Sequence, residues 1–257
     1  MNRLHVPKAS KLKLSPSQSD LFAADITPPL FPDVSSRRTE RQSEPHFSLF
    51  APLHYERGYA YPLLVWLHGD GGNERQLRQV MPHVSVRNYV AVAARGVAEA
   101  DAAHGHTWTQ SRRDASEAAE RVERCIDAAK RRYNIQAQRV FIAGYGSGGT
   151  MALRLALQFP EWFAGAISLG GAMPHGDNPL GRVNDARRLP LLLACCRDSD
   201  DYPTAQVADD LRLLHAGGFS LSLRQYPGGH DLTTLMLADM DRWMMAQICP
   251  ATVGAPT

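Results

Sequence analysis

The sequence of 257 residues lacks any long hydrophobic run. No segment reaches the roughly 18 apolar residues that a membrane-spanning helix requires. Residues 1–32 also lack the sustained apolar core of a signal peptide. These two absences lead us to expect a cytoplasmic protein with no membrane span.

The chain also has little net charge and few cysteines. The formal net charge of +2 is too small to indicate a nucleic acid partner. The four cysteines include no Cys-x-x-Cys pair, so we expect reduced thiols. His104 and His106 lie close together, but no further ligand type stands nearby, and they do not predict a metal site. We expect no metal and no other cofactor, and the sequence leaves the oligomeric state open.

Composition separates the two ends of the chain from its centre. Residues 1–44 are polar, rich in Ser, Pro and Lys, and show no clear period, so we expect a disordered basic tail. We expect a second, short tail over residues 250–257. Residues 45–249 are then expected to form one folded domain.

Buried strands alternate with helical segments from residue 61 onward. The run from Tyr61 to His68 is continuously apolar until its last residue, as in a strand covered on both faces. Residues 114–133 give the clearest helical pattern, with one apolar stripe and acid–base pairs on the opposite side. This alternation predicts an α/β fold with a mostly parallel, twisted sheet and helices on both faces. Ligands bind at the carboxyl ends of the strands in such sheets.

A glycine-rich turn follows the predicted strand 139–145 and precedes a predicted helix. Gly144 and Gly148 match the glycines of the Gly-x-Ser-x-Gly pattern, in which a strained turn lifts a serine above a parallel sheet. Between them stands Gly146, and the hydroxyl of Ser147 comes one position later. The glycines also match a dinucleotide-binding fingerprint, but the acidic residue expected about 20 positions on is missing. The turn therefore has the form of a nucleophile elbow with no side chain at its apex.

Four stretches, in this order, resemble the α/β-hydrolase superfamily. The nearest resemblance is to the phospholipase/carboxylesterase group, which includes acyl-protein thioesterases, and to the related polyhydroxybutyrate-depolymerase-like esterases. The four stretches are LVWLHGDGG at 64–72, RVFIAGY at 139–145, FPEWFAG at 159–165 and YPGGH at 226–230. The resemblance covers residues 47–248 and implies a single α/β-hydrolase domain without a large lid domain.

The resemblance also implies a triad of serine, aspartate and histidine in that chain order. His230 stands after the last strand, where the family has its histidine. A gapless alignment puts Ser199 at the aspartate position, between Asp198 and Asp200; we favour Asp198 as the acid and leave Asp200 open. Ser147 is the candidate nucleophile, provided that the turn shifts by one residue. The alternative is that Ser147 opens the helix and satisfies its free amides.

Other positions are candidates for contact with the substrate. Gly69, Asp70 and Gly146 belong to the expected oxyanion or substrate-binding region, where backbone amides would bind a charged oxygen. Trp108 is the candidate wall of an acyl pocket, with a core role as the equal alternative. Asp201 is expected to be a solvated acid of its loop.

Three functions are compatible with these residues. The first is a carboxylic-ester or thioester hydrolase that acts on a small-molecule ester through Ser147. The second is an inactive relative that binds a small acyl ligand or a protein partner in the former active-site cleft. The third keeps hydrolysis but uses His230 and a carboxylate to activate water directly.

Overall fold

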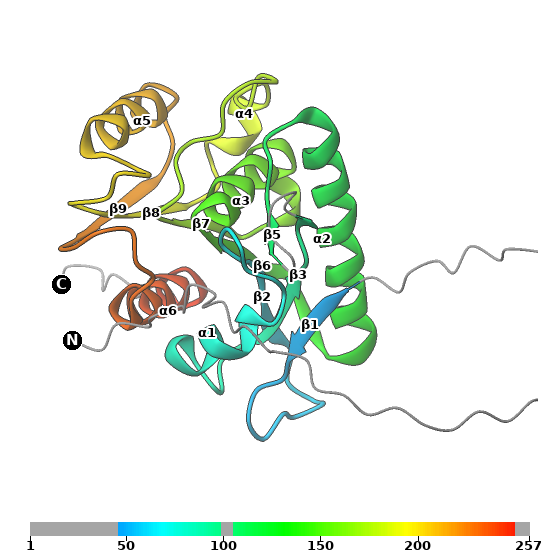
Figure 1. Ribbon diagram of the computed structural model, residues 1–257. Helices are drawn as coiled ribbons and strands as arrows, with labels where there is room; N and C mark the ends of the chain where they lie inside the picture. The colour runs from blue at the N-terminus through cyan, green and yellow to red at the C-terminus, as the bar shows by residue number, and fades with distance from the viewer. Residues whose placement is uncertain (1–45, 99–104, 250–257) are drawn as a thin grey trace, which may run out of the picture. The chain divides into compact units, whose positions relative to one another are not determined.

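The structure is a computed structural model that describes residues 46–98 and 105–249 (Figure 1). The tails predicted over residues 1–44 and 250–257, and His104, lie outside these ranges. Within them, no helix has the length and apolar character needed to cross a membrane. The four cysteines are all described, and none of them forms a disulfide.

A seven-stranded sheet forms the centre of the domain (Figure 1). Its strand order is β1-β3-β2-β6-β7-β8-β9, with β1 antiparallel to β3 and every other neighbouring pair parallel. A small antiparallel ribbon of β4 (Val97–Ala98) and β5 (His106–Thr107) lies outside the sheet. The sheet strands are β1 (Phe47–Phe50), β2 (Tyr61–Leu67), β3 (Val90–Ala94), β6 (Ile135–Tyr145), β7 (Gly165–Leu169), β8 (Leu191–Cys196) and β9 (Leu221–Tyr226).

Helices connect the parallel strands, as the sequence alternation predicts. The predicted helix over 114–133 is present as α2, which begins two residues earlier because the Ser111 side chain accepts a hydrogen bond from the Asp114 amide and caps it. The helices of the described residues are α1 (Gln76–Val84), α2 (Arg112–Arg132), α3 (Ser147–Gln158), the 3-10 helix η1 (Pro160–Trp162), α4 (Val183–Ala186), α5 (Thr204–Ala216) and α6 (Thr234–Ile248).

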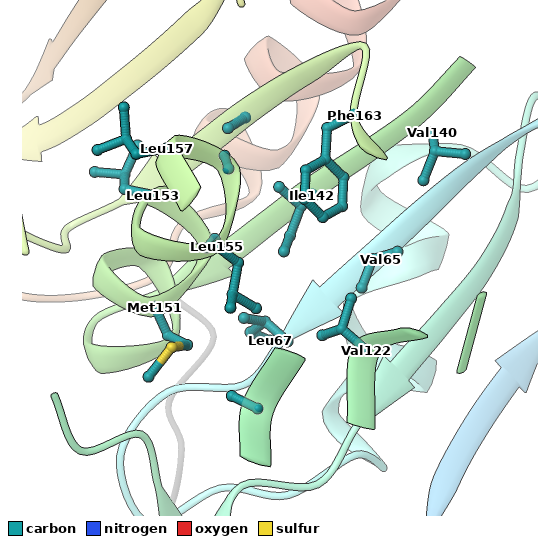
Figure 2. Packing of buried hydrophobic residues seen from close by; sticks show 14 of the residues in the cluster. Val65, Leu67, Val122, Val140, Ile142, Met151, Leu153, Leu155, Leu157 and Phe163 are labelled. Carbon is teal, nitrogen blue, oxygen red and sulfur yellow. The ribbon is translucent and has the colours of Figure 1, made fainter. Parts of the chain in front are cut away.

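The pleat of β2 divides the core into two clusters, because successive side chains of a strand point to opposite faces. Val65 and Leu67 join the cluster that α2 and α3 cover, and Figure 2 shows both in the same packed group as Val122 of α2. Leu64 and Trp66 belong to the other cluster, which α1 and α6 cover. Helices therefore pack on both faces of a mostly parallel sheet, and the predicted fold class is confirmed.

Glycines allow the start of α3 to lie against the end of β2. An ideal Cβ on Gly148 would lie 2.3 Å from the carbonyl oxygen of His68 and 2.5 Å from that of Leu67. A Cβ on Gly144 would lie 2.3 Å from the backbone of Gly148. Real side chains do not approach backbone atoms so closely, so these glycines set the position of the helix start over the sheet.

Replacement of Gly148 by alanine should destabilise the domain, because backbone rather than a flexible side chain would have to move. We expect Gly148→Ala to lower the free energy of unfolding by about 2–3 kcal/mol, the usual cost of overpacking. Urea unfolding followed by circular dichroism measures this. The control is Gly58→Ala, since a Cβ on Gly58 meets nothing within 4 Å. Equal stability of the two variants would contradict the close contact.

Candidate functional site

The glycine turn between β6 and α3 has the conformation of a strained apex. Gly146 has φ 55° and ψ −124°, a backbone geometry that residues with side chains rarely adopt. Ser147 is already the first residue of α3. The apex therefore falls on Gly146, without a shift of one residue toward Ser147.

His230 faces this apex from the loop that follows β9. An ideal Cβ on Gly146 would lie 3.4 Å from the Nε2 atom of His230. The imidazole stacks on the ring of Tyr145, with centroids 5.1 Å apart, and the Tyr145 hydroxyl donates a 3.0 Å hydrogen bond to the His230 carbonyl. The ring is thus held so that one nitrogen points to the place where the side chain of residue 146 would begin.

The other ring nitrogen of His230 meets a hydroxyl rather than a close carboxylate. Ser199 Oγ lies 3.2 Å from Nδ1, and Asp201 Oδ2 lies 3.7 Å from the same atom. The carboxylate of Asp198 instead accepts a 3.3 Å hydrogen bond from the amide of Gly228. Asp201 was expected to be a solvated loop acid; it is exposed, yet it is the carboxylate recorded within ion-pair distance of the ring.

Ser199 is anchored by a second contact. The amide of Tyr202 donates a 3.2 Å hydrogen bond to its Oγ, and Ser199 is buried although both Asp198 and Asp200 are exposed. Ser199, which the gapless alignment puts at the position of the triad aspartate, is thus the residue that hydrogen-bonds to the imidazole.

The hydroxyl of Ser147 belongs to a different group of contacts. Its Oγ lies 3.4 Å from Thr107 Oγ1, and Thr107 also hydrogen-bonds to the carboxylate of Asp70. A carboxylate only accepts, so the single hydroxyl hydrogen of Thr107 goes to Asp70. The bond between the two hydroxyls must then use the hydrogen of Ser147, which directs it toward Thr107.

Asp70 also occupies the start of α3. Its Oδ2 accepts a 3.4 Å hydrogen bond from the amide of Ser147 and lies 3.4 Å from the ideal Cβ position on Gly146. A helix N-terminus favours negative charge, which accounts for a carboxylate there. The amide that would be expected to bind a substrate oxyanion thus already has an anionic acceptor from the chain itself.

The neighbouring Gly69 lies too close to an aromatic ring to be replaced. A Cβ on Gly69 would lie 2.5 Å from the ring of Tyr145, and its amide is 3.4 Å from Gln76 Oε1. The contact locks the 68–72 loop against the end of β6, beside the apex.

His68 and Trp108 support this loop from the core. Trp108 is 4% exposed, and its indole N–H donates a 3.0 Å hydrogen bond to the carbonyl of His68. The amide of Gly96 donates to His68 Nε2, so the hydrogen of the neutral ring must sit on Nδ1 and go to the carbonyl of Gly69. Burial lowers the pKa of His68 to about 4, which keeps this tautomer in place at neutral pH.

Tertiary contacts bring in residues that the sequence pattern did not identify. Thr107 lies in no motif, and Tyr145 ends the stretch 139–145 without having been predicted to have a role; they join the site through the ribbon β4–β5 and through the end of β6. Ser199 stands at the gapless aspartate position, and it, not the predicted Asp198, hydrogen-bonds to the ring of His230. Among the described residues, no group of three or more His, Cys, Asp or Glu could hold a metal ion.

The fold, the strained turn and the facing histidine together define an α/β-hydrolase. Residues 57–248 match the family described as Phospholipase/Carboxylesterase, and the chain belongs to this family. The predicted resemblance is thereby confirmed.

Individual relatives are more distant. "Putative esterase NocK" from Nocardia uniformis subsp. tsuyamanensis is 30% identical over 51% of this chain and 38% of its own length. "Probable carboxylesterase Os04g0669500" from Oryza sativa subsp. japonica is 26% identical over 43% of this chain and 42% of its own length. The chain thus spans about two fifths of these two relatives. The crystal structure of the Bacillus cereus carboxylesterase has a TM-score of 0.64 at 17% identity and covers 80% of this chain and 96% of its own, which shows the shared fold.

The pKa of His68 predicts a loss of stability in mild acid. The unfolded chain takes up a proton near pH 6.5 and the folded chain near pH 4, so stability is complete above about 6.5 and falls as the pH drops toward 4. The full loss is about 3 kcal/mol, from about 1.4 kcal/mol per pKa unit. Urea unfolding between pH 4 and 7 measures it. The dependence of the free energy of unfolding on pH should be weaker in His68→Phe and unchanged in His83→Gln, an exposed control. The same dependence in His68→Phe and in the parent would contradict this prediction.

Proposed function

We propose that this chain is a non-hydrolytic member of the family, which binds a small acyl or ester-like ligand at the site around His230. The observation that carries the proposal is the position of Gly146. The residue with the apex conformation, and with His230 Nε2 3.4 Å from its ideal Cβ, has no oxygen that could attack a carbonyl. An acyl-enzyme intermediate therefore cannot form at the place that the histidine serves.

The contacts of His230 support the same conclusion. In a catalytic triad, a buried carboxylate holds the imidazole and stabilises its charged form. Here the close partner of Nδ1 is the neutral hydroxyl of Ser199, and Asp201 is exposed at 3.7 Å. A hydroxyl can orient the ring, but it offers no charge to stabilise an imidazolium.

Ester hydrolysis also requires stabilisation of an oxyanion, and the negative charge of Asp70 opposes it. Two like charges about 4 Å apart repel by about 4 kcal/mol at an effective dielectric constant of 20. The exposure of Asp70 reduces this value through solvent screening. An oxyanion on the amide of Ser147 would still have to displace, or lie beside, a fixed negative charge.

Ester hydrolysis through Ser147 is the competing function. It requires the hydroxyl to turn from Thr107 toward His230, although Ser147 is the first residue of α3. Purified protein should therefore neither hydrolyse p-nitrophenyl acetate above the rate of a His230→Ala variant nor be labelled by a fluorophosphonate probe. Turnover that is lost in Ser147→Ala would overturn the proposal.

Ligand binding without turnover has its own readout. Ethyl butyrate should shift the NMR signals of the His230 ring in a saturable manner and remain intact in solution. The signals of His83, an exposed histidine on α1, serve as the internal control. If the His230 signals do not shift, the proposed binding of an ester-like ligand is wrong, even if the protein proves inactive.

Restoration of the missing groups should create an esterase. In the variant Gly146→Ser with Ser199→Asp, a new hydroxyl lies next to Nε2 and a carboxylate next to Nδ1 of His230. We expect fluorophosphonate labelling and measurable hydrolysis of p-nitrophenyl acetate, with a gain of about 100-fold or more over the parent, since each group of a triad is worth several powers of ten. Addition of Ser147→Ala should not abolish this gain. Failure to react in a correctly folded variant would contradict the geometry of the apex.

Asp70→Asn should raise the activity of that rebuilt variant further. Removal of the negative charge, with the side-chain shape retained, relieves the repulsion of the oxyanion. After allowance for solvent, we expect an increase of about 10- to 100-fold in kcat/KM. The matched control is Asp200→Asn, which removes an exposed charge that has no recorded contact with His230 or Ser147. An equal increase in both variants would show that Asp70 has no special role.

A further inference from the structure

A second polar region lies along α3, away from the turn at Gly146. Arg154 is 4% exposed, and its guanidinium donates hydrogen bonds to Gln110 Oε1 and to the carbonyls of His175 and Gly176. These acceptors are all neutral. Arg154 is therefore a buried cation that has no carboxylate within hydrogen-bond distance among the described residues, an arrangement that is costly unless an anion compensates it.

Hydrogen-bond donors are in excess around this cation. A guanidinium has five N–H groups, and three of those of Arg154 donate the hydrogen bonds described above. The amide nitrogen of Gln110 is buried and has no hydrogen-bond partner among the described residues. Its oxygen must face Arg154, because the opposite orientation would put two donors together. Additional acceptor atoms would satisfy the remaining N–H groups of Arg154.

A cavity of about 350 Å³ adjoins Arg154, between α2, α3 and the segment 177–182. The residues that line it include Arg112, Arg182, Ser116 and Leu157. Arg112 pairs with Asp177 at 3.2 Å, and Arg182 pairs with Glu161 and Asp185, which do not line the cavity. The lining thus has three cations and one carboxylate.

The backbone next to the cavity is strained. Gly176, Asp177 and Asn178 have φ values of 73°, 52° and 49°, three successive residues in the left-handed region. Asp and Asn tolerate this conformation better than most residues, but it still costs conformational energy. The bonds from Arg154 to the carbonyls of His175 and Gly176 hold this segment over the cavity.

We propose that the cavity beside Arg154 is a binding site for a small organic dianion, a dicarboxylate or a phosphate monoester. The anionic oxygens accept the unused N–H groups of Arg154, and Arg112 supplies the outer positive charge. Burial lowers the pKa of Arg154 from its ordinary value and the negative charge of Asp177 offsets only part of this, so the guanidinium gains from a further negative charge. The site does not involve Gly146 or His230, and it therefore stands or falls independently of the function proposed above.

The test is isothermal titration of the full chain with sodium succinate, sodium phosphate and sodium chloride at matched ionic strength. We expect saturable 1:1 binding of succinate or phosphate and none of chloride. Succinate alone would identify a carboxylate site, phosphate alone a phosphate ester site, and both a general dianion site. Absence of binding for both dianions would overturn the proposal.

Variants locate the site. Arg154→Met should raise the dissociation constant by about tenfold or more, as expected for the loss of a charge-assisted hydrogen bond. Arg112→Ala, at an exposed position that should not affect folding, should raise the dissociation constant by about three- to tenfold through loss of a positive charge. Arg113→Ala is the matched control, since Arg113 is the next residue of α2, is equally exposed and does not line the cavity. An equal effect of Arg112→Ala and Arg113→Ala would show only non-specific attraction and would contradict the site, even if Arg154→Met fails to fold.

Discussion

The site depends on the close contact between the start of α3 and the end of β2. Gly148 lies directly on the carbonyl oxygens of Leu67 and His68, and no other residue type could approach so near. This contact forces the chain from β6 into α3 through a sharp turn, and Gly146 accordingly has a positive φ. The free amides of the helix start are thereby aimed at the carboxyl edge of the sheet, the edge that His230 reaches from the end of β9.

The backbone of this turn has the strained apex conformation although its apex residue carries no side chain. The ring of His230 is oriented toward this turn by stacking on Tyr145. Asp70 satisfies the amide of Ser147 from within the chain. The energetic requirement of the helix start, an acceptor for its free amides, is met here without any substrate. The backbone arrangement of the turn is thus stabilised by contacts within the chain itself.

Sequence reasoning was most successful where local pattern and tertiary structure agree. The apolar run of β2 predicted a strand buried on both faces, and the amphipathic stripe of α2 predicted a helix to within two residues. The edge-strand pairing of β1 with β3, by contrast, left no signal in the pattern. At the site, the glycine spacing predicted Gly146 at the apex of the turn, and the family resemblance implied His230 as the histidine opposite it. Spacing could not show that Ser147 turns to Thr107, since residues 40 positions apart meet there through the fold alone.

The loop after β8 shows a limit of reasoning from residue type. An aspartate was preferred as the partner of His230 because the chemistry of a triad demands a carboxylate, yet the gapless position pointed to Ser199. Ser199 is buried by its bond to the amide of Tyr202, and Asp198 is held by the amide of Gly228. The position of each residue along the backbone of the loop therefore determines which side chain contacts the ring of His230. The preference of a triad for a carboxylate does not determine it.

Both regions of interest are joined by the chain segment that follows β7. At its start, a Cβ on Gly170 would lie 3.1 Å from the ring of His230, and one on Gly171 would lie 2.3 Å from the carbonyl of Gly146. The same segment ends at Gly176, whose carbonyl accepts a hydrogen bond from Arg154. Tight glycine packing therefore fixes one end of this segment, and the hydrogen bond from the buried Arg154 holds the other.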